Sequence, residues 1–233
     1  MAEQSLRDNI ARVYERIDAA KRRAGRTDTV TLVAVSKTQG ADNVAAAYRE
    51  GLRIFGENRV EEAGPKAAAV AALVAPSPLP QWHMIGHLQS RKAAAVLPWA
   101  ALVHSVDSAK LASRLSRAVP PGQQLPVLLE VNVSDEASKD GFAPEALAAA
   151  VETIVELPGL RIEGLMTMAP LAEDPEETRP VFRQLRLLRD EMARRYPAAS
   201  WRHLSMGMSD DFEIAIEEGA TLVRIGRAIF GAR

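Results

Sequence analysis

The stretch TVTLVAVSKTQGADNVAAAYREGLRIFGE, residues 29–57, sets the pattern for the rest of the chain. Its first eight residues are mostly apolar or β-branched, which predicts a buried strand, and residues 41–51 have the spacing of a helix closed by Gly51. A second apolar run follows at 52–57. A strand, a helix and a strand in this order predict two parallel neighbouring strands, because the helix carries the chain back to the same end of the sheet.

The same unit repeats along the whole sequence. We expect strands at 29–36, 52–57, 81–86, 101–107, 125–133, 160–168, 200–207 and 221–226, with helices between them at 41–51, 61–74, 90–97, 108–118, 143–159, 175–196 and 210–219. One extra helix precedes the first strand, at 5–24. Eight units predict a single α/β domain over residues 1–233, a closed (β/α)8 TIM barrel with an added N-terminal helix.

Motif and composition arguments narrow the classes of function. No glycine-rich dinucleotide fingerprint and no phosphate loop ending in GK[ST] is present, which disfavours an open doubly wound sheet. The chain carries 29 basic and 30 acidic residues, too balanced for nucleic-acid binding. It has no cysteine, no signal peptide and no membrane-spanning run, so we expect a cytoplasmic protein that binds no membrane.

The ends of the eight strands predict where the site lies, because TIM barrels place their active sites at the carboxyl ends of the strands. Lys37 follows the first strand and shares its side with Val33 and Val35, since alternate residues of a strand face the same way. By the same rule Arg224 shares its side with Gly226. Ser205 likewise shares its side with His203 and Gly207. A lysine, an arginine and a serine are therefore expected at one mouth.

The loops after the seventh and eighth strands, SMGMSDD at 205–211 and RIGRAIFG at 224–231, predict an anion site. Both combine glycine with the start of a helix, where free backbone N–H groups bind anions, and barrels often bind phosphate there. A phosphate site beside Lys37 suggests a phosphorylated aldehyde held as a Schiff base. Burial and a nearby cation would lower the pKa of Lys37 for that purpose. The strand context alone fits a solvated strand-end lysine equally well.

Eight motifs carry a resemblance over residues 5–233: VAVSKTQ, FGENRVEE, WHMIGHLQSRK, HSVDS, VNVSDEASKDGF, GLMTM, LSMGMSDDFEIAI and VRIGRAIFG. Together they resemble the pyridoxal phosphate homeostasis protein family, whose barrel is that of the alanine racemase N-terminal domain. The resemblance implies a protein that carries and buffers pyridoxal 5′-phosphate (PLP) and maintains vitamin B6 and amino-acid homeostasis.

The resemblance also implies a role for particular residues. Lys37 would hold PLP as a Schiff base. Arg224 would face the pyridine nitrogen and, as a permanent cation, would keep that nitrogen unprotonated and the ring a weak electron sink. The remaining cofactor-binding residues are expected to be Asn58, His83, Ser205, Gly207, Gly226 and Arg227. Many relatives have threonine in place of Arg227, so only its backbone amide is expected to contact phosphate.

The resemblance leaves the protein between a carrier and an enzyme. Alanine racemases use a tyrosine base from a second domain, whereas the tyrosines here, Tyr14, Tyr48 and Tyr196, lie in predicted helices. We therefore expect no catalytic residues and a carrier that passes PLP to apo-enzymes, with a single-domain racemase-like enzyme as the alternative. A cofactor-free Schiff-base aldolase acting on a sugar phosphate is a third reading.

Three smaller expectations complete the sequence reading. The four histidines lack the H-x-H pair of metal-dependent barrel hydrolases, so we expect no metal site. Glu130 and Asn132 interrupt an apolar strand, which predicts a satisfied hydrogen-bond network around a buried carboxylate. We expect the protein to be a monomer.

Overall fold

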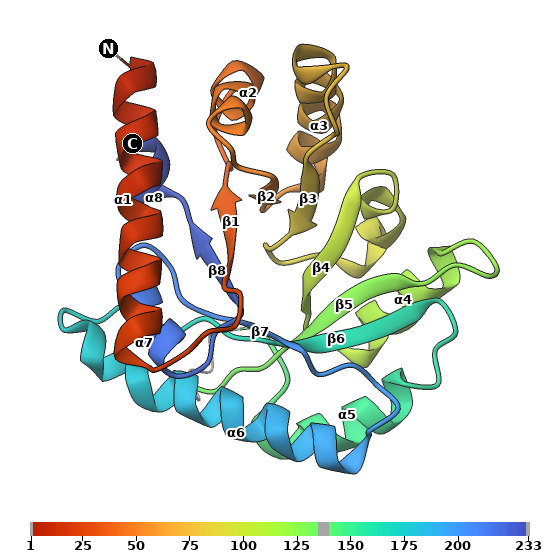
Figure 1. Ribbon diagram of the computed structural model, residues 1–233. Helices are drawn as coiled ribbons and strands as arrows, with labels where there is room; N and C mark the ends of the chain where they lie inside the picture. Colours follow the sequence, from red (N-terminus) through yellow and green to blue (C-terminus); the bar gives the residue numbers. More distant parts are fainter. Residues whose placement is uncertain (1, 135–139, 232–233) are drawn as a thin grey trace.

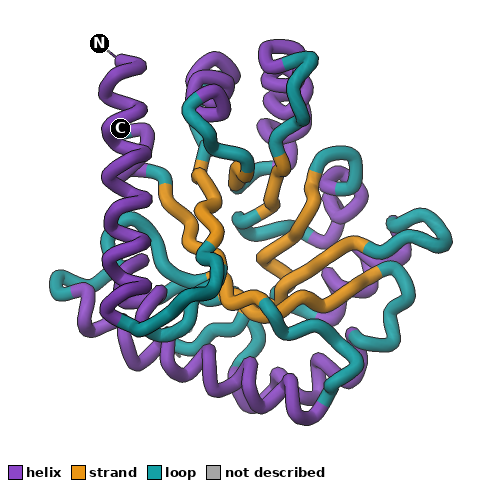
Figure 2. Tube along the Cα trace, in the orientation of Figure 1, coloured by secondary structure: helices purple, strands orange, loops and turns teal. Residues whose placement is uncertain are grey.

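Eight parallel strands form a closed barrel in the computed structural model, which describes residues 2–134 and 140–231 (Figures 1 and 2). The strands are β1 (Thr31–Val35), β2 (Ile54–Glu57), β3 (Gln81–Met84), β4 (Ala100–Val106), β5 (Leu125–Glu130), β6 (Leu160–Met166), β7 (His203–Ser205) and β8 (Leu222–Ile225). They follow one another around the barrel in chain order, and β8 pairs with β1. The predicted fold class is confirmed.

Helices surround the barrel on the outside (Figure 2). The α-helices are α1 (Ala2–Arg23), α2 (Ala41–Arg49), α3 (Val60–Val74), α4 (Ala109–Ala118), α5 (Leu147–Ile154), α6 (Arg179–Arg195), α7 (Phe212–Glu217) and α8 (Arg227–Phe230). Three 3-10 segments join them: η1 (Ser90–Val96), η2 (Pro144–Ala146) and η3 (Pro175–Thr178). None of the helices in the described ranges is both long and apolar enough to cross a membrane.

Two apolar clusters hold this arrangement. A small one fills the barrel and consists of Val33, Ile85, Leu102, Leu128, Met166 and Leu222. A much larger one lies between the outer strand faces and the helices. The extra helix α1 packs against α7 and α8, where Ile10, Val13 and Ile17 are buried and Arg16 forms an ion pair with Glu213 at 2.6 Å. Figure 1 shows α1 and α8 side by side.

Several predicted elements differ from the structure. Strand β5 ends at Glu130 and not at 133, because the chain then turns so that Val131 bridges to Phe142. Residues 90–96 form a 3-10 helix and not an α-helix. The helix expected at 143–159 is α-helical only from Leu147 to Ile154, after a 3-10 turn that begins at Pro144. The strands expected at 160–168 and 200–207 also end earlier, at Met166 and Ser205, so the ends of β5, β6 and β7 lie two or three residues before their predicted positions.

Candidate functional site

The turn after β1 presents Lys37 at the mouth of the barrel. Just before it, the Ser36 hydroxyl donates to Oε1 of the fully buried Glu57 at 2.7 Å. Lys66 donates to the same oxygen at 2.7 Å and to the Ser36 carbonyl at 2.9 Å, which anchors the end of β1 to α3. Thr38 then has a φ of +66°, a conformation that β-branched residues rarely adopt. A fixed anchor and a strained turn thus set the direction in which Lys37 leaves the barrel.

A cavity of about 420 Å³ opens beside Lys37, within the usual range for small-molecule sites. Its walls are Val35, Lys37, Pro170, Leu171, Ala172, Pro175, Thr178, Met208, Ser209, Asp210, Asp211, Arg224, Gly226 and Arg227. The loops after β6, β7 and β8 therefore build most of it. Lys37 itself is exposed, so the burial expected to lower its pKa is not found in this structure.

One wall of the cavity offers hydrogen-bond donors. Ser209 contributes a hydroxyl to this wall. Among the described residues, this hydroxyl makes one long hydrogen bond, which it accepts from the Ala228 amide at 3.4 Å. Within the described residues, no acceptor is recorded for the backbone N–H groups of Ser209, Asp210 and Gly226. A Cβ atom at Gly226 would come within 3.2 Å of the Val35 carbonyl oxygen, so there is little room for a side chain at this corner of the cavity. Donors without acceptors around a small space suit an anion.

Arg224 forms the floor of the cavity. Only 4% of it is exposed, and its Nη1 and Nη2 donate to the Ser205 hydroxyl at 2.7 Å and to the Thr167 carbonyl at 3.0 Å. No carboxylate of the described chain forms an ion pair with it. Burial lowers the pKa of Arg224 to about 10, although Glu130 and Asp211 raise it, so Arg224 remains a cation at neutral pH.

Arg227 lies at the rim above this floor. It is 63% exposed and forms an ion pair with Asp210, which is equally exposed. The side chain therefore spans the loops after β7 and β8 at the edge of the cavity. We call Lys37, Arg224 and Arg227 the cationic side of the mouth.

The structure brings four of the eight predicted residues to this cavity: Lys37, Arg224, Gly226 and Arg227. Ser205 lies below Arg224, fully buried, with its hydroxyl bonded to Arg224 and His104. Gly207 has a φ of +89°, and a Cβ atom there would meet Phe212 and Ala215, so the backbone conformation and tight packing both require glycine.

The last two predicted residues lie elsewhere. Asn58 lines an adjacent pocket of about 400 Å³ that also includes Arg59, Gly86 and His87. The Oδ1 atom of Asn58 is buried and has no recorded hydrogen-bond donor among the described residues. His83 lines a third cavity, of about 280 Å³, at the opposite end of the barrel, where the strands begin.

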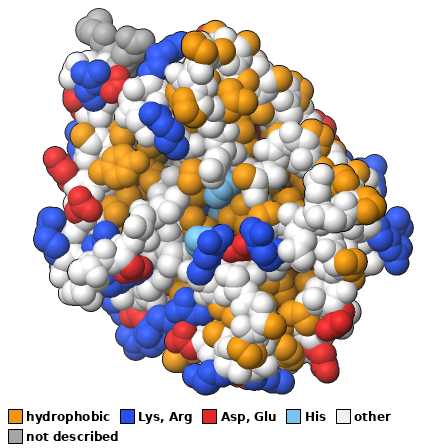
Figure 3. Space-filling view, turned by 45° about the vertical axis from the view of Figure 1, so that its right-hand side comes forward, with side chains coloured by type: hydrophobic (Ala, Val, Ile, Leu, Met, Phe, Trp, Pro, Cys, Tyr) orange, Lys and Arg blue, Asp and Glu red, His pale blue; other side chains and the backbone are white. Residues whose placement is uncertain are grey.

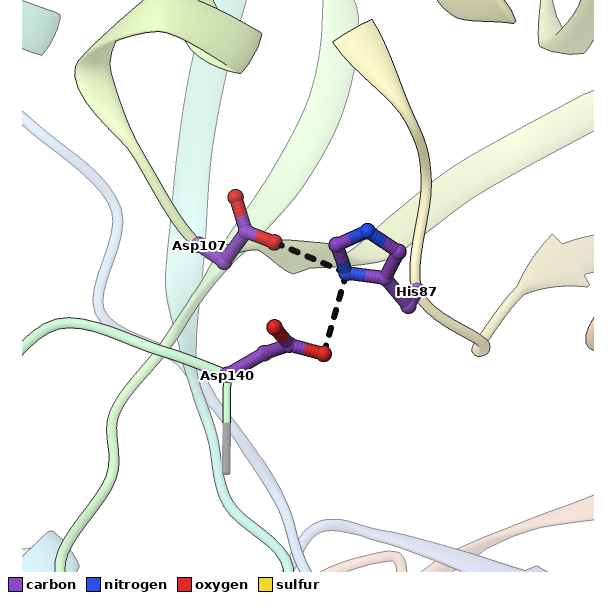
Figure 4. A group of neighbouring side chains, drawn as sticks. All are labelled: His87, Asp107 and Asp140. Carbon is purple, nitrogen blue, oxygen red and sulfur yellow. Dashed lines mark ion pairs between the residues drawn. The ribbon is translucent and has the colours of Figure 1, made fainter. Parts of the chain in front are cut away.

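The opposite part of the mouth carries negative charge, as Figure 4 shows. Nδ1 of His87 lies 3.1 Å from Asp107 and 3.0 Å from Asp140, so this one imidazole joins the loops that follow β3, β4 and β5. These three residues are the one group among the described ranges whose donor atoms could surround a metal ion. The contacts are equally those of a histidine paired with two carboxylates.

Glu130 stands beside this group at the end of β5. It is only 3% exposed, and none of the described residues donates a hydrogen bond to its carboxylate. Burial, with Asp107 and Asp140 nearby, raises the pKa of Glu130 to about 7. The burial expected of Glu130 is confirmed, and among the described residues the structure shows no hydrogen-bond network around its carboxylate. We call Asp107, Glu130 and Asp140 the acidic side.

Sequence reasoning missed Ser209 and His104. The motif SMGMS contains two serines, and a strand that continued to 207 would have put the first of them at the mouth. Because β7 ends at Ser205, the second serine reaches the cavity instead. His104 is fully buried inside the barrel, where an apolar strand gave no sign that its ring would meet Ser205.

Comparisons with known proteins agree with this geometry. Residues 9–233 match the family model of the alanine racemase N-terminal domain. A pyridoxal phosphate homeostasis protein of Pseudomonas aeruginosa is 47% identical over 231 residues, which cover 98% of this chain and 96% of that protein. One from Aquifex aeolicus is 45% identical over 228 residues, 97% of each chain.

A solved structure extends the comparison to three dimensions. PipY of Synechococcus elongatus, determined with PLP bound, superposes with a TM-score of 0.81 at 34% identity. The match covers 97% of this chain and all of that one.

Proposed function

Because the chain belongs to the pyridoxal phosphate homeostasis protein family, we propose that it binds PLP in the cavity at the barrel mouth and holds it for other proteins. The observation that carries the proposal is the convergence of an amine, a buried cation and unused N–H donors on one cavity of about 420 Å³. The whole chain acts as a single PLP-binding domain in the cytoplasm, and apo-enzymes that need the cofactor are its recipients.

The residues present fit the chemical groups of PLP. Ser209, with the backbone N–H groups of Ser209, Asp210 and Gly226, supplies neutral donors for a phosphate. Lys37 supplies the amine that attaches the aldehyde as a Schiff base. The apolar side chains of Val35, Pro170 and Leu171 complete the walls around the ring.

Arg224 determines what the site can do with a bound ring. When bound, PLP supplies an aldehyde and a ring that withdraws electrons most strongly if its nitrogen is protonated. A guanidinium cation does not accept a proton from the ring nitrogen and repels one on it. Arg224 therefore favours storage of the cofactor over electron withdrawal from a bound substrate.

The side chains around the cavity also bear on the racemase alternative. The titratable groups among the lining residues are Lys37, Arg224 and Arg227 with Asp210 and Asp211. Asp211 accepts a hydrogen bond from the Met208 amide at 2.6 Å, so it is committed to the loop after β7. Of these lining groups, Lys37 is the best placed to move a proton. A site with one such group and no second base among its lining residues is the arrangement that we expect of a carrier.

Spectroscopy of the purified protein tests the proposal. A visible absorption band that borohydride reduces and fixes on the Lys37 peptide is the expected result, and a protein that takes up no PLP contradicts it. Racemisation of amino acids, followed by circular dichroism, separates the racemase-like enzyme from the carrier. Turnover above the rate of free PLP would establish the racemase-like alternative.

A further inference from the structure

A column of four buried polar side chains runs along the inside of the barrel. Arg224 Nη1 donates to the Ser205 oxygen at 2.7 Å, and that oxygen lies 2.8 Å from Nδ1 of His104. Nε2 of His104 lies 3.0 Å from Nδ1 of His83. Ser205 and His104 are fully buried, and 4% of each of the other two is exposed. The column therefore connects the floor of the cofactor cavity to the opposite end of the barrel.

The direction of every hydrogen bond in this column follows from its first member. A guanidinium can only donate, so the Ser205 oxygen accepts from Arg224. The proton of the Ser205 hydroxyl needs an acceptor, because an unsatisfied buried donor costs about 1–3 kcal/mol. Among the described residues, only Nδ1 of His104 is recorded within reach of it.

The two imidazoles must then share one tautomer. His104 accepts at Nδ1, so its proton lies on Nε2, and it donates to Nδ1 of His83. His83 in turn carries its proton on Nε2. Burial lowers the pKa of His83 to about 3 and that of His104 well below its ordinary value, which keeps both rings neutral.

The lower end of the column opens into the cavity where the strands begin. That cavity is lined by His83 and His203 together with Glu163, which lies between Arg161 and Arg202. The same combination of side-chain types is seen in the hollow at the centre of Figure 3. A proton on Nε2 of His83 can therefore meet solvent there, whereas the upper bonds of the column are closed.

Arg224 depends on this column because no carboxylate of the described chain pairs with it. Its two recorded partners are neutral oxygens, the Ser205 hydroxyl and the Thr167 carbonyl, on the two different Nη atoms. A carbonyl can only accept, but a hydroxyl can turn. If nothing accepted the Ser205 proton, the buried hydroxyl would keep an unsatisfied donor, and that cost would act against the position in which its oxygen accepts from Arg224.

We propose that His104 is a positioning residue of the cofactor site. By accepting the Ser205 proton, it fixes the serine oxygen as an acceptor and so holds the Arg224 guanidinium in the floor of the cavity. His83 supports it by accepting from Nε2. The identity of the ligand above Arg224 rests on the proposed function, but the direction of the hydrogen bonds does not.

The first test needs no cofactor. Two-dimensional ¹H–¹⁵N spectra of the histidine rings, recorded on the full-length protein without added PLP, distinguish the tautomers. The expected result is a proton on Nε2 in both His83 and His104. A proton on Nδ1 of His104 would overturn the proposal, because the ring would then donate to Ser205. This result stands whether or not the protein binds PLP.

The second test compares His104→Asn with His104→Leu. The asparagine amide can place its oxygen near the position of Nδ1 and accept the Ser205 proton, whereas leucine fills the space with no acceptor. We expect PLP affinity within about twofold of wild type for H104N and a loss of about tenfold for H104L, equivalent to one hydrogen bond. Equal losses, or no loss in either variant, would overturn the positioning role.

A structural defect would show differently. Both variants are compared with wild type by circular dichroism and thermal unfolding, and the visible band of the bound cofactor is recorded from pH 6 to 9. If Arg224 is no longer held in position in H104L, the pH dependence of the visible band should change in that variant. In H104N it should remain that of wild type. If H104L does not fold, the comparison of H104N with wild type and the tautomer spectra still decide the question.

Discussion

The two sides of the barrel mouth handle charge in opposite ways. On the cationic side, Arg224 is held by neutral oxygens and its charge is left for a ligand. On the acidic side, His87 lies between two of the three carboxylates. The pKa of the third, Glu130, is raised to about 7, which favours its protonated form. An anion is therefore favoured on the cationic side, whereas the carboxylates of the acidic side would favour a cation.

This asymmetry also gives a bound phosphate one preferred direction. The N–H donors of the loops after β7 and β8 lie at the cationic side, while Asp107, Glu130 and Asp140 would repel a phosphate from the other.

Loss of Lys37 has the largest expected effect. Lys37→Ala removes the amine from the cavity, so borohydride should fix no cofactor on the protein, as judged by mass spectrometry of the digested chain. Lys92→Ala is the matched control, because Lys92 lines the adjacent pocket of the same mouth. Labelling of K37A at the wild-type level would place the covalent site elsewhere.

Loss of Arg224 comes next. Arg224→Leu removes a buried cation and leaves the Ser205 hydroxyl and the Thr167 carbonyl without their donor. A hydrogen bond to a charged group contributes about 1.5–3 kcal/mol, so PLP affinity should fall about 10- to 100-fold and the free energy of unfolding should drop. Arg224→Lys keeps the positive charge but not the paired donors. Its PLP affinity and its free energy of unfolding should therefore lie between those of wild type and of R224L. Titration followed by fluorescence, with urea unfolding, measures both effects.

Ser209 separates phosphate binding from the rest of the cavity. Ser209→Ala removes one neutral donor and should weaken PLP binding about fivefold to tenfold, the value of about one hydrogen bond. Binding of pyridoxal, which has no phosphate, should not change. Ser205→Ala serves as the comparison, because the buried hydroxyl should affect both ligands alike through Arg224. Equal losses for PLP and pyridoxal in S209A would move the phosphate away from this wall.

Glu130 makes the acidic side sensitive to pH. Its pKa is about 7 in the folded protein and near 4.5 when exposed, so between these values the folded state holds a proton that the unfolded state has released. Stability from this group is therefore present below pH 4.5 and is lost as pH rises through 7. Glu130→Gln cannot titrate, so its stability relative to wild type should increase from pH 5 to pH 8. Urea unfolding at each pH measures this, and a constant difference would contradict it.

His87 should have the smallest effect. It is 49% exposed and pairs with Asp107 and Asp140 at the surface, where an ion pair contributes about 0–1 kcal/mol. His87→Ala should change the free energy of unfolding by no more than this, and PLP affinity should stay within about twofold. A tenfold change in affinity would show that the acidic side takes part in ligand binding.

The sequence predicted the barrel and the position of Lys37 because both depend on short-range patterns. Alternation along β1 places Val33 and Val35 inside the barrel, and the next residue of that parity, Lys37, lines the cavity. Arg224 and Gly226 follow the same rule on β8.

The remaining site residues depended on where strands end and on contacts across the barrel. Ser205 was expected at the phosphate, but β7 stops there and Ser209 lines the cavity instead. His83 was expected beside the cofactor, but it points into the lower cavity because it lies one layer deeper than the strand end. The pattern of residues within one strand does not predict how deep in the barrel a side chain lies, because that depth is set by the pairing of the strand with its neighbours.

The pairing of β8 with β1 has a consequence for the moment at which the protein becomes useful to the cell. Val33, two layers below Lys37, lies opposite Arg224, which is synthesised only after the first seven strands. At about 5–20 residues per second, translation leaves a lag on the order of ten seconds or more between the two strands. A nascent chain thus exposes its lysine long before it has a floor or a phosphate wall beside it. The cavity in which we propose that PLP binds is therefore complete only in molecules whose eighth strand has paired with the first.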